Sequence, residues 1–149
     1  MQPFPLDAGI DPTTPLARVV MSDIGKLRVR ALPVNTPVPT GQNDALFFSP
    51  PNGARGVYTI ILPPVAYFDH RVRLSFADEF KHVDGQLAAQ GFTRTETTQP
   101  PADAKTFTTK YARGGAEIAV TISVTEVRSD GQIVYRVKME LEKLVAALN

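Results

Sequence analysis

The sequence predicts an α+β fold in which an antiparallel sheet carries one principal helix on one of its faces. Two segments near the C-terminus alternate apolar and polar residues, an Asp-Gly turn joins them, and an apolar stripe at helical spacing precedes them. Alternation with period two is typical of a half-buried strand, and spacing of three and four is typical of an amphipathic helix. The connections are short, which favours an antiparallel α+β arrangement over a doubly wound one.

The composition bounds the domain organisation. The chain has 149 residues, 43% of them hydrophobic and 21% charged, which is the balance of a globular domain with its own core. Of the 13 prolines, 11 lie in the first 64 residues, so the first half should consist of loops, edge strands and short extended pieces. We expect an extended or disordered proline-rich arm over residues 1–15 and a single α+β domain over residues 16–149.

In the N-terminal half, alternation predicts a strand over Lys26–Leu32, and a nearly continuous apolar run predicts another over Gly56–Leu62. That apolar run indicates burial on both faces or a central place in a sheet. Arg18–Ile24 is expected to hold a helical turn and Ala45–Phe48 is a short apolar piece. Val65–Leu74 should be a short extended approach to the helix.

The principal helix is predicted to begin after Ser75, a good N-cap with Asp78 three residues later, and to end before Gly91. Gly85 lies inside it at a cost of about 1 kcal/mol relative to alanine, and we expect it to mark a kink or a close backbone approach. The apolar stripe, which should pack on the last two strands, consists of Phe76, Phe80, Val83 and Leu87.

Four strands in a meander should follow the helix. Asp130-Gly131 tolerates the positive φ values of a tight hairpin between the last two strands, and Arg113-Gly114-Gly115 turns the chain between the second and third. A short helix over Glu142–Leu148 is expected at the end. The four predicted strands are Phe92–Thr98, Lys105–Tyr111, Glu117–Val127 and Gln132–Leu141.

Several functional classes receive no support from the sequence. A net charge of +1 gives no basic excess for nucleic acid, and no apolar run is long enough to span a bilayer. The absence of cysteine excludes disulfides, thiol nucleophiles and cysteine-ligated zinc. We therefore expect no nucleic-acid partner, no transmembrane segment, no cofactor, no metal and no catalytic residue. A proline-rich start is common after a cleavage site, so a periplasmic or exported protein is expected, with a cytoplasmic one as the alternative.

One cluster interleaves aromatic and basic side chains, and it is the candidate ligand-binding site. Its members are Tyr67, Phe68, His70, Arg71 and Arg73. Aromatic faces and guanidinium groups both stack on nucleotides or sugars. The other interpretation is a set of core aromatic residues beside solvated arginines.

A second set combines carboxylates with both histidines: Asp69, His70, Asp78, Glu79 and His82. Asp78 and His82 lie four residues apart, so they share a helix face and would suit an acid–base pair or a metal. The plainer interpretation is a surface pair that stabilises the helix by about 0.2–0.5 kcal/mol.

The predicted function is a non-enzymatic binding or assembly module of the bacterial cell envelope, whose partner is a protein. The partner would bind an exposed strand edge or the proline-rich arm, and a sheet edge could also form a homodimer. A hydroxyl-rich sheet face could accept a partner strand or a glycan. One alternative is a small-molecule or carbohydrate binder with a pocket between helix and sheet, walled by Phe68, Phe76 and Tyr135. Another is a hydrolase or metal enzyme centred on Asp69, His70 and His82. The hydroxyl-rich rows are Thr93, Thr95 and Thr97; Thr106 and Thr108; and Thr121, Ser123 and Thr125.

Overall fold

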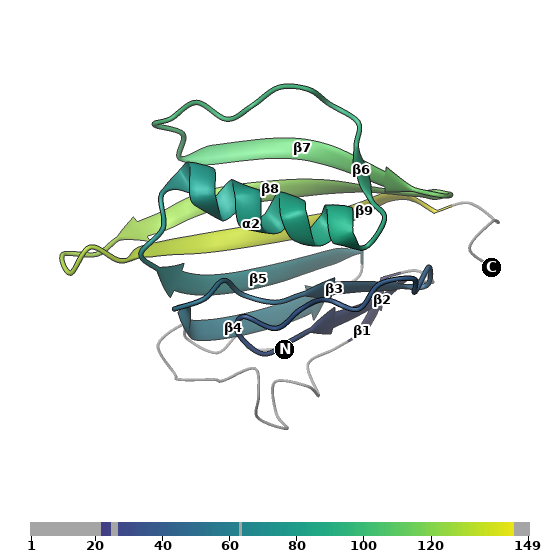
Figure 1. Cartoon of the computed structure of the whole chain (residues 1–149), viewed down its shortest axis with the longest axis horizontal. Helices are drawn as coiled ribbons and strands as arrows, with labels where there is room; N and C mark the ends of the chain where they lie inside the picture. Colours follow the sequence, from purple (N-terminus) through teal and green to yellow (C-terminus); the bar gives the residue numbers. More distant parts are fainter. Residues whose placement is uncertain (1–21, 25–26, 63, 145–149) are drawn as a thin grey trace.

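The structure is a computed structural model that describes residues 22–24, 27–62 and 64–144 (Figure 1). In this part of the chain one helix and nine strands form two sheets, and the α+β class is confirmed. The elements are β1 Ser22–Ile24, β2 Leu27–Ala31, β3 Ala45–Phe48, β4 Arg55–Leu62, β5 Val65–Val72, α2 Phe76–Ala89, β6 Thr93–Arg94, β7 Thr106–Arg113, β8 Ala116–Val127 and β9 Ile133–Leu144.

The large sheet has six antiparallel strands in the order β4-β5-β9-β8-β7-β6. Strands β6 to β9 form the predicted C-terminal meander, in which each strand pairs with the next along the chain. Strand β9 also pairs with β5 over eight positions, from Val65 opposite Glu140 to Val72 opposite Ile133. The N-terminal hairpin β4–β5 therefore belongs to the same sheet as the meander.

The small sheet has the order β1-β2-β3, with β2 and β3 parallel. It lies on the same face of the large sheet as α2, so the helix and the small sheet together form the second layer of the molecule (Figure 1). The aromatic ring of Phe48 on β3 packs against that of Phe68 on β5, with ring centroids 4.8 Å apart. Both strands contribute to one hydrophobic core.

The predicted ends and apolar face of the helix are confirmed. The Ser75 hydroxyl accepts a hydrogen bond from the Asp78 backbone N–H at 3.2 Å, and Gly91 has φ +88° just beyond the C-terminus. The apolar stripe is buried against the sheet. Its Phe80 ring meets Phe107 of β7 edge to face at 5.5 Å, so the contact extends beyond the two strands predicted for it.

Of the two alternatives for Gly56–Leu62, burial on both faces is confirmed, since Val57, Tyr58, Ile60 and Ile61 are only 5–7% exposed. The central place is not, because β4 is an edge strand of the large sheet. Another strand prediction needs correction. The strand predicted over Phe92–Thr98 is reduced to two residues in β6. After Thr95 the chain leaves the sheet towards two prolines, which have no N–H to donate to a ladder.

Three further segments differ from the prediction. Val65–Val72 is a full strand between β4 and β9 and not a short approach to the helix, because its backbone is paired on both sides. Ser22–Ile24 is a strand paired with β2, where a helical turn was expected. β9 continues to Leu144, where a helix was expected from Glu142, because Ala116 and Glu117 of β8 pair with this stretch. The predicted arm over residues 1–15 and residues 145–148 lie outside the described residues.

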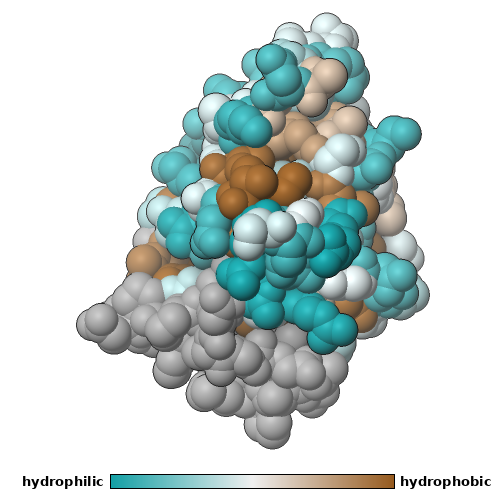
Figure 2. All heavy atoms as spheres, turned by 90° about the vertical axis from the view of Figure 1, so that its left-hand side faces the viewer, coloured by the Kyte–Doolittle hydropathy of each residue, from teal (hydrophilic) through white to brown (hydrophobic). Residues whose placement is uncertain are grey.

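At the end of the molecule where the β8–β9 hairpin meets the start of α2, apolar side chains gather on the surface (Figure 2). The half-buried apolar residues near this end are Leu74 between β5 and α2, Phe107 at the start of β7, Val124 on β8 and Ile133 on β9. The core therefore reaches the surface here. Among the described residues, no helix is long and apolar enough to cross a membrane.

Candidate functional site

The pleat of β5 divides the predicted ligand-binding cluster between two faces of the sheet. Phe68 and His70 point into the core and are 2% and 0% exposed. Tyr67 and Arg71, at alternate positions, belong to the opposite face, and Arg73 follows the strand as an exposed residue. The structure thus does not bring the five residues together on one surface.

On the outer face, the Asp69 carboxylate of β5 forms an ion pair with the Arg136 guanidinium of β9. Asp69 accepts a two-pronged contact from Arg136, with Nε to Oδ1 at 2.9 Å and Nη2 to Oδ2 at 2.7 Å. The hydrogen bond that Arg136 donates to Asp69 raises the pKa of the Arg136 guanidinium, whose carbon lies 4.8 Å from the centre of the Tyr67 ring. Burial raises the pKa of the neighbouring Tyr58 hydroxyl. The contacts between Asp69 and Arg136 join β5 to β9, and each of these two charged groups has the other as its partner.

On the inner face, His70 forms a buried pair with the helix. Its Nε2 lies 3.0 Å from a carboxylate oxygen of Glu79, and both side chains are fully buried. The rings of Tyr135 and Phe48 flank His70 at 6.3 and 6.2 Å. Phe68, Phe76 and Tyr135, the expected pocket walls, are at most 5% exposed and pack within the core.

The residues of the enzyme hypothesis lie in three different environments. Asp69 is on the outer face, His70 is in the core, and His82 is bonded to a carbonyl of the chain that follows β3. Asp78, the predicted partner of His82, is exposed, and its N–H takes part in the helix cap. The described residues contain no group of three or more potential ligands that could hold a metal ion.

A ladder of side chains spaced by four residues joins α2 to the free edge of β3. Gln90 accepts from the Phe47 N–H at 2.7 Å and donates to the Phe47 carbonyl at 2.8 Å. Gln86 makes the same pair of contacts with Ser49, at 3.0 and 2.9 Å, and His82 Nε2 reaches the Ser49 carbonyl at 2.6 Å. Side chains of the helix thus replace the neighbouring strand that β3 lacks on this side.

Sequence reasoning missed the roles of the two glutamines. Their spacing from His82, at four and eight residues, places all three on one helix face and was a readable signal. The strand that they bind lies about 40 residues earlier in the chain, with sequence separations of 37 and 43 for the two contacts. Helix periodicity alone indicates a polar face and does not say what that face contacts.

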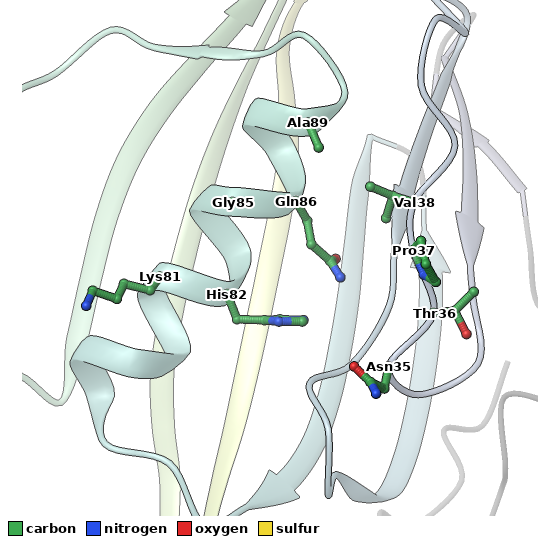
Figure 3. A pocket seen from close by; sticks show the side chains of 9 residues that line it. All are labelled: Asn35, Thr36, Pro37, Val38, Lys81, His82, Gly85, Gln86 and Ala89. Carbon is green, nitrogen blue, oxygen red and sulfur yellow. The ribbon is translucent and has the colours of Figure 1, made fainter.

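Beside this ladder, a groove of about 490 Å³ runs between α2 and the proline-rich segment that follows β2 (Figure 3). Gly85 lies at its helical wall, where a Cβ atom would meet no atom within 4 Å. The expectation that Gly85 marks a close backbone approach is therefore wrong. The groove is lined by Asn35, Thr36, Pro37, Val38, Lys81, His82, Gly85, Gln86 and Ala89.

The polar groups of the groove have defined roles. A carbonyl oxygen only accepts, so His82 must donate from Nε2 to Ser49, and in the neutral ring Nδ1 is then an acceptor. Nδ1 has no hydrogen-bond partner in the described part of the chain. Lys81 is the one lysine or arginine of the lining, and the lining includes no carboxylate. The Lys81 side chain, however, extends from the helix away from the groove (Figure 3). The groove therefore offers an acceptor and an apolar wall.

A second cavity of about 230 Å³ lies between α2 and the segment that joins β6 to β7. Phe80 and Arg94 border it, with the guanidinium carbon 5.4 Å from the centre of the Phe80 ring. Lys81 lines both cavities. The complete lining is Ala77, Phe80, Lys81, Asp84, Arg94, Gln99 and Pro100.

Part of the hydroxyl-rich face expected from the sequence is present. Thr106 contacts Ser123 at 3.2 Å and Thr108 contacts Thr121 at 2.8 Å, hydroxyl to hydroxyl, across β7 and β8. β6 pairs with only two residues of β7, so the first half of β7 has no strand partner on that side in the described chain. Binding of a partner strand or a second copy at this edge stays a prediction.

No protein-family model matches the chain, and neither a curated protein nor a solved structure matches it.

Proposed function

We propose that the chain is a non-enzymatic protein-binding module that receives an extended segment of a partner in the groove between α2 and Asn35–Val38. The proposal rests on the presence of a glycine, Gly85, in the helical wall of the groove. A glycine inside a helix destabilises it by about 1 kcal/mol relative to alanine. Because a Cβ at Gly85 would meet no atom within 4 Å, packing within the fold gives no reason for that loss. Close approach of a partner segment to the helix at this position gives a reason for the glycine.

The chemistry of the lining suits a peptide. Pro37, Val38 and Ala89 offer apolar contact, and a volume of about 490 Å³ falls within the range of about 300–1,000 Å³ typical of ligand sites. His82 Nδ1 can accept a hydrogen bond from a backbone N–H of the partner. An extended chain carries donors and acceptors along its whole length.

The wall opposite the helix is extended and rich in proline. The Asn35 N–H donates to the Pro50 carbonyl at 2.8 Å, and the Thr36 N–H donates to the Ser49 hydroxyl at 2.8 Å. Asn35 has φ +56°, a conformation that asparagine tolerates better than most residues. Anchored at this end and stiffened by Pro37 and Pro39, the segment should lose little freedom when a partner binds.

The test is selection from a displayed library of random dodecapeptides against the full chain, followed by affinity measurements on synthetic copies of the enriched peptides. Gly85→Gln places a side chain in the groove, and Ala88→Gln places the same side chain on an exposed helix position outside it. We expect Gly85→Gln to weaken binding at least about tenfold and Ala88→Gln to leave it unchanged. Lack of enrichment, or peptides that bind Gly85→Gln as well as the parent chain, would overturn the proposal.

We also propose the bacterial cell envelope as the compartment. The chain contains no cysteine, so its fold needs no protection of thiols in an oxidising compartment. Fractionation of cells that carry a C-terminally tagged full-length protein tests this proposal. Tag recovered in the periplasmic or envelope fraction supports it, and tag confined to the cytoplasmic fraction refutes it.

A further inference from the structure

We infer that the second cavity, between α2 and residues 99–100, is a binding site for a carboxylate. This site is separate from the groove of the proposed function and does not rest on it. The lining includes two cations, Lys81 and Arg94, and one carboxylate, Asp84, so its formal charge is positive. Phe80 adds an aromatic wall beneath the Arg94 guanidinium.

The orientation of Arg94 defines which of its donors face a ligand. Its Nη1 donates to the Thr98 carbonyl at 2.6 Å and lies 3.2 Å from the Thr109 hydroxyl. Nε and Nη2 make no hydrogen bond within the described part of the chain. These two donors form one straight edge of the planar guanidinium, which is the geometry that holds both oxygens of a carboxylate.

Asp84, the acidic residue of the lining, forms no hydrogen bond with the free edge of the Arg94 guanidinium. Its Oδ1 accepts a hydrogen bond from the Tyr111 hydroxyl at 2.7 Å. Burial, and then this bond, raise the pKa of Tyr111, so the hydroxyl remains the donor. The Lys81 ammonium forms no ion pair with any carboxylate in the described part of the chain. Both cations are therefore available to an incoming anion.

The size of the site limits the ligand. A volume of about 230 Å³ lies below the usual range of about 300–1,000 Å³ for drug-sized ligands. A single acidic group with a small apolar or aromatic body would fit, with its flat face against Phe80 and its carboxylate on Arg94. Such a group can be a free small acid or an acidic side chain of a partner.

Titrations of the 15N-labelled full chain, followed by the Arg94 Nε–H resonance and, in every variant, by the backbone amide resonances of Phe80 and Gln99, test this inference. The probes are benzoate and its neutral analogue benzamide, and the peptide acetyl-Ala-Glu-Ala-amide with its Gln counterpart. We expect each carboxylate to bind at least about tenfold more tightly than its neutral analogue, since charge-assisted bonds to a guanidinium are the stronger ones. Tighter binding of benzoate would assign the site to free acids, and tighter binding of the Glu peptide would assign it to a partner side chain.

Substitutions test whether benzoate binds in this cavity. Arg94→Lys keeps the charge and removes the two-donor edge, and Ala77→Leu fills the cavity from an exposed helix position. Both substitutions should weaken benzoate binding at least about fivefold. The controls are the same substitutions at exposed positions outside the lining, Arg73→Lys and Ala88→Leu, and they should leave benzoate binding unchanged. Equal affinity for benzoate and benzamide, no saturable shift at Arg94, or full binding by Ala77→Leu would each overturn the inference. Gly85→Gln should leave it intact, which separates it from the groove.

Discussion

The side-chain amide of Gln90 pairs with the backbone of Phe47 in both directions, accepting from its N–H at 2.7 Å and donating to its carbonyl at 2.8 Å. This is the pattern with which one strand closes the edge of another. Gln90 is 5% exposed, so water cannot easily replace it. The small sheet is therefore held to the helix by polar contacts as well as by the core.

Replacing Gln90 with leucine should destabilise the fold by about 2–4 kcal/mol, because a donor and an acceptor of Phe47 lose their partner where water has little access. Urea denaturation measures the change. Gln42→Leu, at an exposed position, is the matched control and should change stability by less than about 0.5 kcal/mol. A loss at Gln90 no larger than at Gln42 would show that the amide is not needed to close the edge.

Gly85→Ala should raise the free energy of unfolding by about 0.5–1 kcal/mol. The position is helical, and the added Cβ meets no atom within 4 Å. Thermal or urea denaturation measures this gain. Gly114→Ala serves as the contrast, since its Cβ is equally free of contacts but its φ is +59°, and that variant should lose stability. A destabilised Gly85→Ala would mean that the helix backbone is distorted there.

The buried pair of His70 and Glu79 should show strong coupling in a double-mutant cycle. His70→Leu leaves a fully buried carboxylate without its partner and should cost about 3–5 kcal/mol, whereas the double variant with Glu79→Leu should cost less than His70→Leu alone. Denaturation of the four proteins gives the coupling energy. The exposed pair Lys138–Glu140, at 3.6 Å, is the control and should couple by less than about 1 kcal/mol. Additive losses at the buried pair would exclude the coupling.

The β8–β9 hairpin should contribute to the acid dependence of stability. The Gln132 N–H donates to Asp130 Oδ1 at 3.0 Å, and this bond, followed by the charges of Arg128 and Arg73, lowers the pKa of the carboxyl group. A lowered pKa in the folded state means that the stabilisation is present above the ordinary carboxyl pKa and is lost as the pH falls through the lowered value.

Asp130→Asn keeps an oxygen acceptor and removes the charge. The difference in stability between the parent chain and Asp130→Asn should be largest near pH 6 and should shrink towards pH 2. Urea denaturation across this range measures it. A difference that does not change with pH would show that the charge of Asp130 adds nothing to the turn.

The elements whose signals are local could be predicted from the sequence. Ser75, the apolar stripe and Gly91 define the helix, and Asp130-Gly131 defines the hairpin, because caps, amphipathic faces and tight turns depend on residues a few positions apart. The alternation of β8 and β9 likewise predicted which side chains are buried. In these segments local preference and tertiary packing agree.

The relationships between segments far apart in the sequence were decided only by the tertiary structure. Strand pairing made β5 a central strand and placed Tyr67 and His70 on opposite faces, so a cluster in sequence is not a cluster in space. The groove and the carboxylate cavity arise where α2 meets Pro37 on one side and Arg94 on the other. A sequence pattern reports the faces of one element, whereas a site needs two elements, and their docking is determined by the packing of the whole core.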